Sequence, residues 1–174
     1  MESLGKMIMS DTLRFERRLK GPLQRVWAYL TESELRGKWL AKGEMELFEG
    51  GKVNLQFLHR ELSPEAGSPP PQYQGMEAGH SFAGIILKVN PPYLLSYTWE
   101  GGSEVTFELE EQGNEVLLTL THRKLPADPA ARISVLGGWH THVDILIANL
   151  NGETPPNFWK RFEALQDTYR EQGS

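Results

Sequence analysis

Three polar residues in this sequence continue rows of alternating apolar residues, and their side chains could bind or react with a small molecule. Arg17, His59 and His122 each stand at every-second-residue spacing from the apolar residues of a predicted β-strand, which places them on the same face of that strand. A guanidinium suits a carboxylate or an enolate, and a histidine ring can act as an acid or a base near neutral pH. Two interpretations remain open. The side chains fix the polar end of an otherwise apolar ligand, or they lie at strand ends and reach water or backbone carbonyls.

Large aromatic residues near these rows allow the same two interpretations. Trp39, Tyr97, Trp99 and Trp139 could line a cavity or fill a solid hydrophobic core, because large rings bury much area in either role. If there is a cavity, the polar and apolar positions together predict one ligand-binding set. It consists of Arg17, Trp39, Phe57, His59, Tyr97, Trp99, Phe107, Leu120, His122 and Trp139.

Other kinds of chemistry find little support in the sequence. There is no cysteine, no G-x-S-x-G motif and no serine with an evident base, so we predict no catalytic residue and favour binding over catalysis. His140 and His142 are two residues apart, which on a helix separates their directions by about 200°, whereas paired metal ligands on one face stand four residues apart. We therefore expect no metal and no cofactor.

Composition narrows the choice of partners. The 18 basic residues are scattered along the chain and the net charge is −5, so we do not expect nucleic acid to bind. The absence of cysteine excludes disulfides and fits a reducing cytoplasm. The first residues lack the apolar segment of a signal peptide, and no apolar run approaches the roughly 18 residues that span a bilayer. We therefore expect a cytoplasmic protein with no membrane partner.

Hydrophobic periodicity predicts the elements that must position the candidate residues. Period-2 alternation predicts strands near residues 12–19, 53–60 and 82–89, and three more between 90 and 122. Helical spacing predicts two short helices after Pro22 and Thr31, a long helix at 129–150 and a last helix from 154. A sheet with one buried face needs a cover, and the long helix is its natural partner, so the fold class is α+β.

The two ends of the chain and one internal segment lie outside this scheme. We expect residues 1–10 to form a flexible tail, residues 11–152 to form the domain, and residues 153–174 to form an appended helix that packs on the same domain. A homodimer built partly on that helix and partly on an exposed strand edge is the close alternative, so the protein is predicted to be a monomer or a homodimer. Residues 61–79 are rich in Pro, Gly and Ser and predict a mobile loop or lid.

Short motifs in family order resemble the START-like (Bet v 1-like) superfamily, and within it the activator of Hsp90 ATPase homologue 1-like family. They span about residues 12–150, whereas the long 61–79 loop and the last helix depart from the common pattern. The matching motifs are Phe15-x-Arg17, Val26-Trp27, Leu30-Thr31, Lys38-Trp39-Leu40, Gly84-x-Ile86, Pro91-Pro92, Leu95-x-Tyr97-Thr98-Trp99, His122 and Gly138-Trp139.

The resemblance implies a helix-grip fold, in which a curved antiparallel sheet wraps around a long C-terminal helix and encloses a cavity. Relatives include carriers of hydrophobic molecules, polyketide cyclase-like proteins and a co-chaperone domain, so the fold does not fix the activity. We expect a small hydrophobic ligand in a cavity bordered by Phe57, Phe107, Leu120 and Trp139. The alternatives are an Hsp90 co-chaperone-like module that binds a chaperone, and a cyclase- or hydrolase-type enzyme that uses a pocket histidine.

Overall fold

The protein is described by a computed structural model that covers residues 4–64, 71, 73 and 79–173. Its strands are β1 (Lys6–Met9), β2 (Thr12–Lys20), β3 (Lys52–Phe57), β4 (His80–Asn90), β5 (Leu94–Thr98), β6 (Glu104–Gln112) and β7 (Glu115–Arg123). Its helices are α1 (Leu23–Thr31), α2 (Ser33–Arg36), α3 (Pro129–Asn151) and α4 (Phe158–Gly173).

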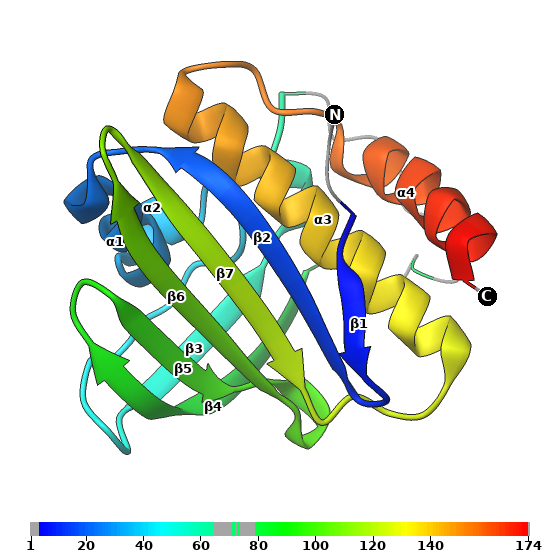
Figure 1. Cartoon of the computed structure of the whole chain (residues 1–174), viewed down its shortest axis with the longest axis horizontal. Helices are drawn as coiled ribbons and strands as arrows, with labels where there is room; N and C mark the ends of the chain where they lie inside the picture. The colour runs from blue at the N-terminus through cyan, green and yellow to red at the C-terminus, as the bar shows by residue number, and fades with distance from the viewer. Residues whose placement is uncertain (1–3, 65–70, 72, 74–78, 174) are drawn as a thin grey trace.

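The strands form a seven-stranded antiparallel sheet in the order β1-β2-β7-β6-β5-β4-β3. Figure 1 shows the curved sheet with α3 running along it and α4 lying beside α3. Helices α1 and α2 fill the connection between β2 and β3 at one end of the sheet. The predicted α+β class and helix-grip arrangement are confirmed.

The centre of the sheet is a solid core. Phe15, Leu120, Phe107 and Leu95 are paired in register across β2, β7, β6 and β5, and each is at most 1% exposed. Trp39 contacts the ring of Phe107 edge-on with a centroid separation of 6.4 Å. Burial of such side chains is the main favourable contribution to the free energy of folding, on the order of 2 kcal/mol for each large apolar group.

Two local features differ from the sequence prediction. Lys6–Met9, expected to belong to a flexible tail, form the edge strand β1 because the chain turns back at Ser10 and Asp11 and pairs with β2. Strand β3 ends at Phe57, so His59 does not extend a strand; it begins a single 3-10 turn. Its ring nevertheless points inward and is 5% exposed.

Helix α4 packs along α3 and buries its own apolar face. Phe158, Trp159, Phe162, Leu165 and Tyr169 are each at most 4% exposed within the single chain. Of the two adjacent glycines in α3, only Gly137 lies against α4. A Cβ at Gly137 would lie 3.3 Å from Gln166 and 3.5 Å from Phe162, whereas a Cβ at Gly138 would meet no atom within 4 Å.

Most of the predicted lid, at residues 65–70, 72 and 74–78, lies outside the described residues. Tyr73 is described and is held by both long helices. Its hydroxyl lies 2.7 Å from the Ser134 hydroxyl of α3 and accepts a hydrogen bond from Gln166 Nε2 of α4 at 3.2 Å. Its ring stacks on that of Trp159.

Candidate ligand-binding site

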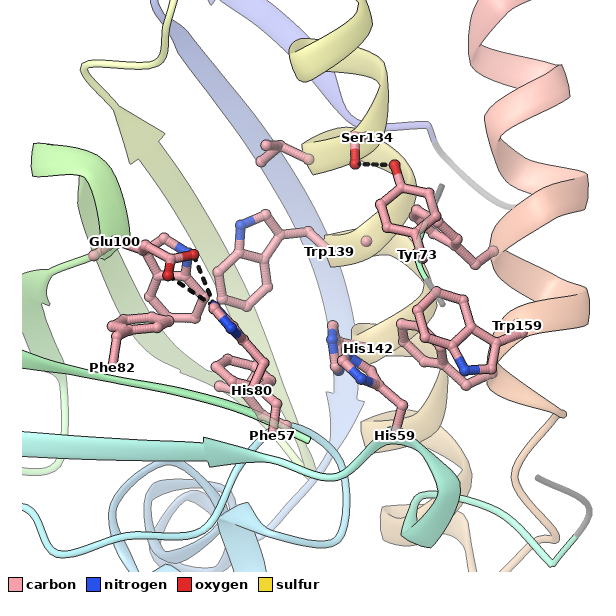
Figure 2. Close-up of a pocket in the computed structure, with 16 residues that line it drawn as sticks. Phe57, His59, Tyr73, His80, Phe82, Glu100, Ser134, Trp139, His142 and Trp159 are labelled. Atoms are coloured by element: carbon pink, nitrogen blue, oxygen red, sulfur yellow. Dashed lines mark hydrogen bonds and ion pairs between the residues drawn. The ribbon is translucent and has the colours of Figure 1, made fainter. Parts of the chain in front are cut away.

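A pocket of about 180 Å³ lies where β3 and β4 meet α3 and α4, and aromatic rings form most of its wall (Figure 2). The helices place these rings by their periodicity, since Phe158 and Phe162 stand four residues apart on one face of α4. The rings that line the pocket belong to Phe57, Tyr73, Phe82, Trp99, Trp139, Phe158, Trp159 and Phe162.

The structure brings only part of the predicted ligand-binding set into this pocket. Phe57, His59, Trp99 and Trp139 line it. The other predicted residues do not line it; they are Arg17, Trp39, Tyr97, Phe107, Leu120 and His122. The expected cavity border therefore does not extend to Phe107 and Leu120, and the ring of Phe107 packs edge-on against Trp39 and Trp139 instead.

Arg17 belongs to a buried polar group elsewhere in the fold. Its guanidinium donates a hydrogen bond to the Glu16 carbonyl, lies over the ring of Phe15, and approaches His140 Nε2 at 3.4 Å. The other nitrogen of His140 lies 2.8 Å from the hydroxyl of Tyr169, which also accepts a hydrogen bond from the Gly5 N–H. This group joins β2 and the N-terminal segment to both long helices.

His122 is held by hydrogen bonds at both ring nitrogens. The Trp139 indole N–H donates to Nδ1 at 2.9 Å, so Nε2 carries the proton and donates to the Ser103 hydroxyl at 2.8 Å. That hydroxyl donates in turn to the Glu100 carbonyl. Burial lowers the pKa of His122 to about 4, and the ring is neutral at pH 7. This histidine fixes Trp139 and the loop after β5.

His142 presents a free acceptor to the pocket. Its Nδ1 lies 2.8 Å from the Trp39 carbonyl, which can only accept, so Nδ1 carries the proton and Nε2 carries a lone pair. Burial lowers the pKa of His142 to about 4, and the hydrogen bond to Trp39 opposes that shift. Within the part of the chain that the structure describes, no side chain or carbonyl bonds to Nε2.

His59 lies next to His142, with ring centroids 5.7 Å apart. Its ring also packs against Phe158 at 4.5 Å and Trp159 at 5.0 Å. Burial lowers the pKa of His59 to about 3, with smaller contributions from His142 and His80. Its Nδ1 is buried and has no hydrogen-bond partner among the described residues. An unsatisfied buried nitrogen costs about 1–3 kcal/mol, so this ring keeps an unused polar atom next to the pocket.

The mouth of the pocket carries one partly exposed hydrogen-bonded pair. Nε2 of His80 lies 3.0 Å and 2.8 Å from the two carboxylate oxygens of Glu100, as Figure 2 shows. None of the described lining residues is a lysine or an arginine. The described residues also contain no group of three or more His, Asp or Glu side chains that could hold a metal ion.

Several lining residues were not predicted from the sequence. His142 stands three residues after Trp139 on the same face of α3, and this spacing could have found it. Phe158, Trp159 and Phe162 come from α4, which was predicted to pack on the same domain but was not included in the ligand-binding set. Tyr73 sits in the Pro-rich segment, where periodicity carries no information.

A family model described as Activator of Hsp90 ATPase homolog 1-like protein matches residues 20–151. The chain belongs to this family. The family model spans α1, α2, strands β3 to β7 and the whole of α3, and it ends before α4, the helix that completes the pocket.

Solved structures support the assignment of the fold. The protein encoded by gene BPP1335 from Bordetella parapertussis is 37% identical, with a TM-score of 0.82 over 99% of this chain and 91% of that protein. CalU16 from Micromonospora echinospora is 23% identical, with a TM-score of 0.65 over 92% and 86%. EF2215 from Enterococcus faecalis, described as a conserved protein of unknown function, is 21% identical, with a TM-score of 0.66 over 92% and 83%. The latter two show the fold alone.

Two negative findings complete the description of the chain. No curated protein is significantly similar to the chain. Among the described helices, none combines the length and the apolar character that crossing a membrane requires.

Proposed function

We propose that this member of the family binds a small, largely apolar aromatic molecule in the pocket between α3, α4 and the β3–β4 end of the sheet. The observation that carries the proposal is the wall of the pocket, in which aromatic rings from four elements surround an unpartnered histidine nitrogen. Ligand pockets are typically mostly apolar with a few placed polar groups.

The size of the pocket supports a ligand of one aromatic ring with small substituents. Its volume of about 180 Å³ is close to the ~150 Å³ of an engineered apolar cavity that binds benzene. Apolar area removed from water contributes about 25 cal/mol per Å², so a ligand of this size gains several kcal/mol from burial alone.

Catalysis of a cyclase or hydrolase type receives less support from the site. Such an enzyme predicts an arginine and a histidine that converge inside the pocket. The pair that approaches this geometry, Arg17 and His140, lies outside the pocket, and both nitrogens of His122 are already hydrogen-bonded. The binding proposal is therefore non-catalytic.

The family description also suggests an Hsp90 co-chaperone-like role. Such a role would use an outer surface and would not require the pocket. The two functions are separable at Gly138, because a side chain there would fill the pocket without altering the outer surface. Gly138 lines the pocket, and its Cβ direction is open.

Native mass spectrometry of the protein purified gently from its own host tests the proposal. We expect a bound small molecule in the wild-type protein and its loss in Gly138→Leu at equal folded fraction. The absence of any bound molecule from the wild type, or the same adduct in both proteins, would contradict the proposal.

A further inference from the structure

We infer that the pocket selects neutral aromatic molecules that carry a hydroxyl group, of the phenol class, and that His142 Nε2 accepts the hydroxyl proton in a hydrogen bond. The inference rests on the proposed function and adds the chemical class of the ligand. It depends on the direction of one hydrogen bond, on the environment of His59, and on the charge of the lining.

The direction of the His142 hydrogen bond fixes what the pocket can recognise. A carbonyl oxygen cannot donate, so the 2.8 Å contact with the Trp39 carbonyl requires the proton on Nδ1. A neutral imidazole has one N–H, and Nε2 must therefore act as an acceptor. A ligand that buries its polar atom here without donating a proton would leave this lone pair unsatisfied.

His59 provides the second polar contact. Its unpartnered Nδ1 belongs to a ring whose centroid lies 5.7 Å from that of His142. Two hydrogen bonds of about 2.8 Å that meet at one hydroxyl oxygen at a roughly tetrahedral angle join nitrogens about 4.6 Å apart, so two rings this close together can share a single hydroxyl. A hydroxyl that donates its proton to His142 keeps its lone pairs, so it can also bond to His59 in the tautomer whose Nδ1 carries the proton.

The charge of the lining disfavours anions. The described lining residues include no lysine or arginine, and the segment 61–79, from which Tyr73 reaches the pocket, has neither residue in its sequence. The carboxylate of Glu100 lies at the mouth. A carboxylate ligand would be stripped of water without a cation to pair with, which is costly. The ligand is therefore neutral, in contrast to the carboxylate or enolate that Arg17 would have suited.

Isothermal titration calorimetry at pH 7.5 with two isomeric ligands and one anion tests separately the need for a hydroxyl donor and the need for a neutral ligand. 4-Ethylphenol and 4-methylanisole have the same atoms, but only the phenol can donate a hydrogen bond. 4-Methylbenzoate adds a negative charge to a similar shape. We expect the phenol to bind about tenfold more tightly than the ether, which is the value of one buried hydrogen bond, and the benzoate to bind at least tenfold more weakly than the ether.

Two variants test the assigned atom. In His142→Phe, the preference for the phenol over the ether should fall to less than twofold, because the phenyl ring offers no hydrogen-bond acceptor. In His142→Gln, the amide N–H can bond to the Trp39 carbonyl and the amide oxygen can accept from the ligand, so the preference should return. A long-range ¹H–¹⁵N spectrum adds a test that needs no variant, because it reports which nitrogen of His142 carries the proton.

The outcomes distinguish this inference from the proposed function. Equal affinity for phenol and ether, a preference that survives His142→Phe, or a proton on Nε2 would overturn the inference and leave the binding proposal standing. Failure of both isomers to bind would overturn both. Tight binding of 4-methylbenzoate would overturn the conclusion on charge.

Discussion

The pocket histidines occupy neighbouring positions but bear differently on stability. His142 holds the Trp39 carbonyl, whereas Nδ1 of His59 has no partner among the described residues. We predict that His142→Phe lowers the free energy of unfolding by about 1–3 kcal/mol, because it leaves a carbonyl unpaired. His59→Phe should be neutral or stabilising by up to about 1 kcal/mol.

Urea unfolding of the two variants and the wild type at pH 7.5 checks this contrast. The pair is well matched, since both substitutions replace a buried imidazole by a phenyl ring in the same pocket. Equal losses in the two variants would contradict this prediction and would mean that the His59 ring forms a stabilising polar contact in the folded chain.

Acid should destabilise the protein through the same rings. Burial lowers the pKa of His59 to about 3 and those of His122 and His142 to about 4, against an ordinary value near 6.5 in the unfolded chain. As the pH falls through 6.5 the unfolded state binds protons first, so stability present above pH 6.5 is lost progressively toward pH 4.

Between pH 7.5 and pH 5.5 the expected loss is on the order of 1 kcal/mol for each ring. His59→Phe removes one of these rings and should show a smaller loss over that range, as measured by urea unfolding at the two pH values. A loss that is identical in the variant and the wild type would show that His59 does not titrate as inferred.

At the scale of elements, the two adjacent glycines of α3 face different surroundings. Gly137 lies against Gln166 and Phe162 of α4, whereas the Cβ direction of Gly138 is open. We predict that Gly137→Leu destabilises by about 1–3 kcal/mol or more through overpacking. Gly138→Leu should be neutral or stabilising by up to about 1 kcal/mol, because leucine favours a helix more than glycine does. Thermal unfolding of both variants tests this prediction. Equal changes in stability would contradict the difference in packing between the two glycines.

The elements themselves could largely be predicted from the sequence. Alternation such as Val105, Phe107 and Leu109 predicts β6, and the same period predicts β7 and β2, because one buried face and one wet face leave a period-2 pattern. Strand β1 was missed, since Lys6–Met9 alternate weakly and gain their structure only by pairing with β2. The different surroundings of the two glycines of α3 depend on the position of α4 and could not be predicted from the sequence.

The candidate site was harder to predict than the fold. Phe57, His59, Trp99 and Trp139 line the pocket, but Arg17 and His122 do not, although a strand pattern alone gives them equal rank. Periodicity tells which face a residue takes but not whether a hydrogen-bond partner meets it there. Trp139 and Ser103 satisfy His122, and both come from elements distant in the sequence.

At the scale of the whole molecule, α4 is both a wall of the pocket and a cover for α3. Its residues Phe158, Trp159 and Phe162 line the pocket, and Arg161 pairs with Asp144 of α3 at 2.9 Å. We predict that a chain ending at Gly152 loses several kcal/mol of stability and loses ligand binding, because the α3 surface and the pocket both open to water. Thermal unfolding and sedimentation of both chains check this, and a shortened chain that is monomeric and equally stable would contradict it.

The central claim is that the aromatic pocket is a ligand-binding site, and an NMR titration with ethylbenzene tests it most directly. The indole N–H signals of Trp99, Trp139 and Trp159 report on the pocket wall. We predict saturable shifts of these signals in the wild-type protein and their absence in folded Gly138→Leu, whose side chain fills the space. No shifts in the wild type, or the same shifts in Gly138→Leu, would contradict the account.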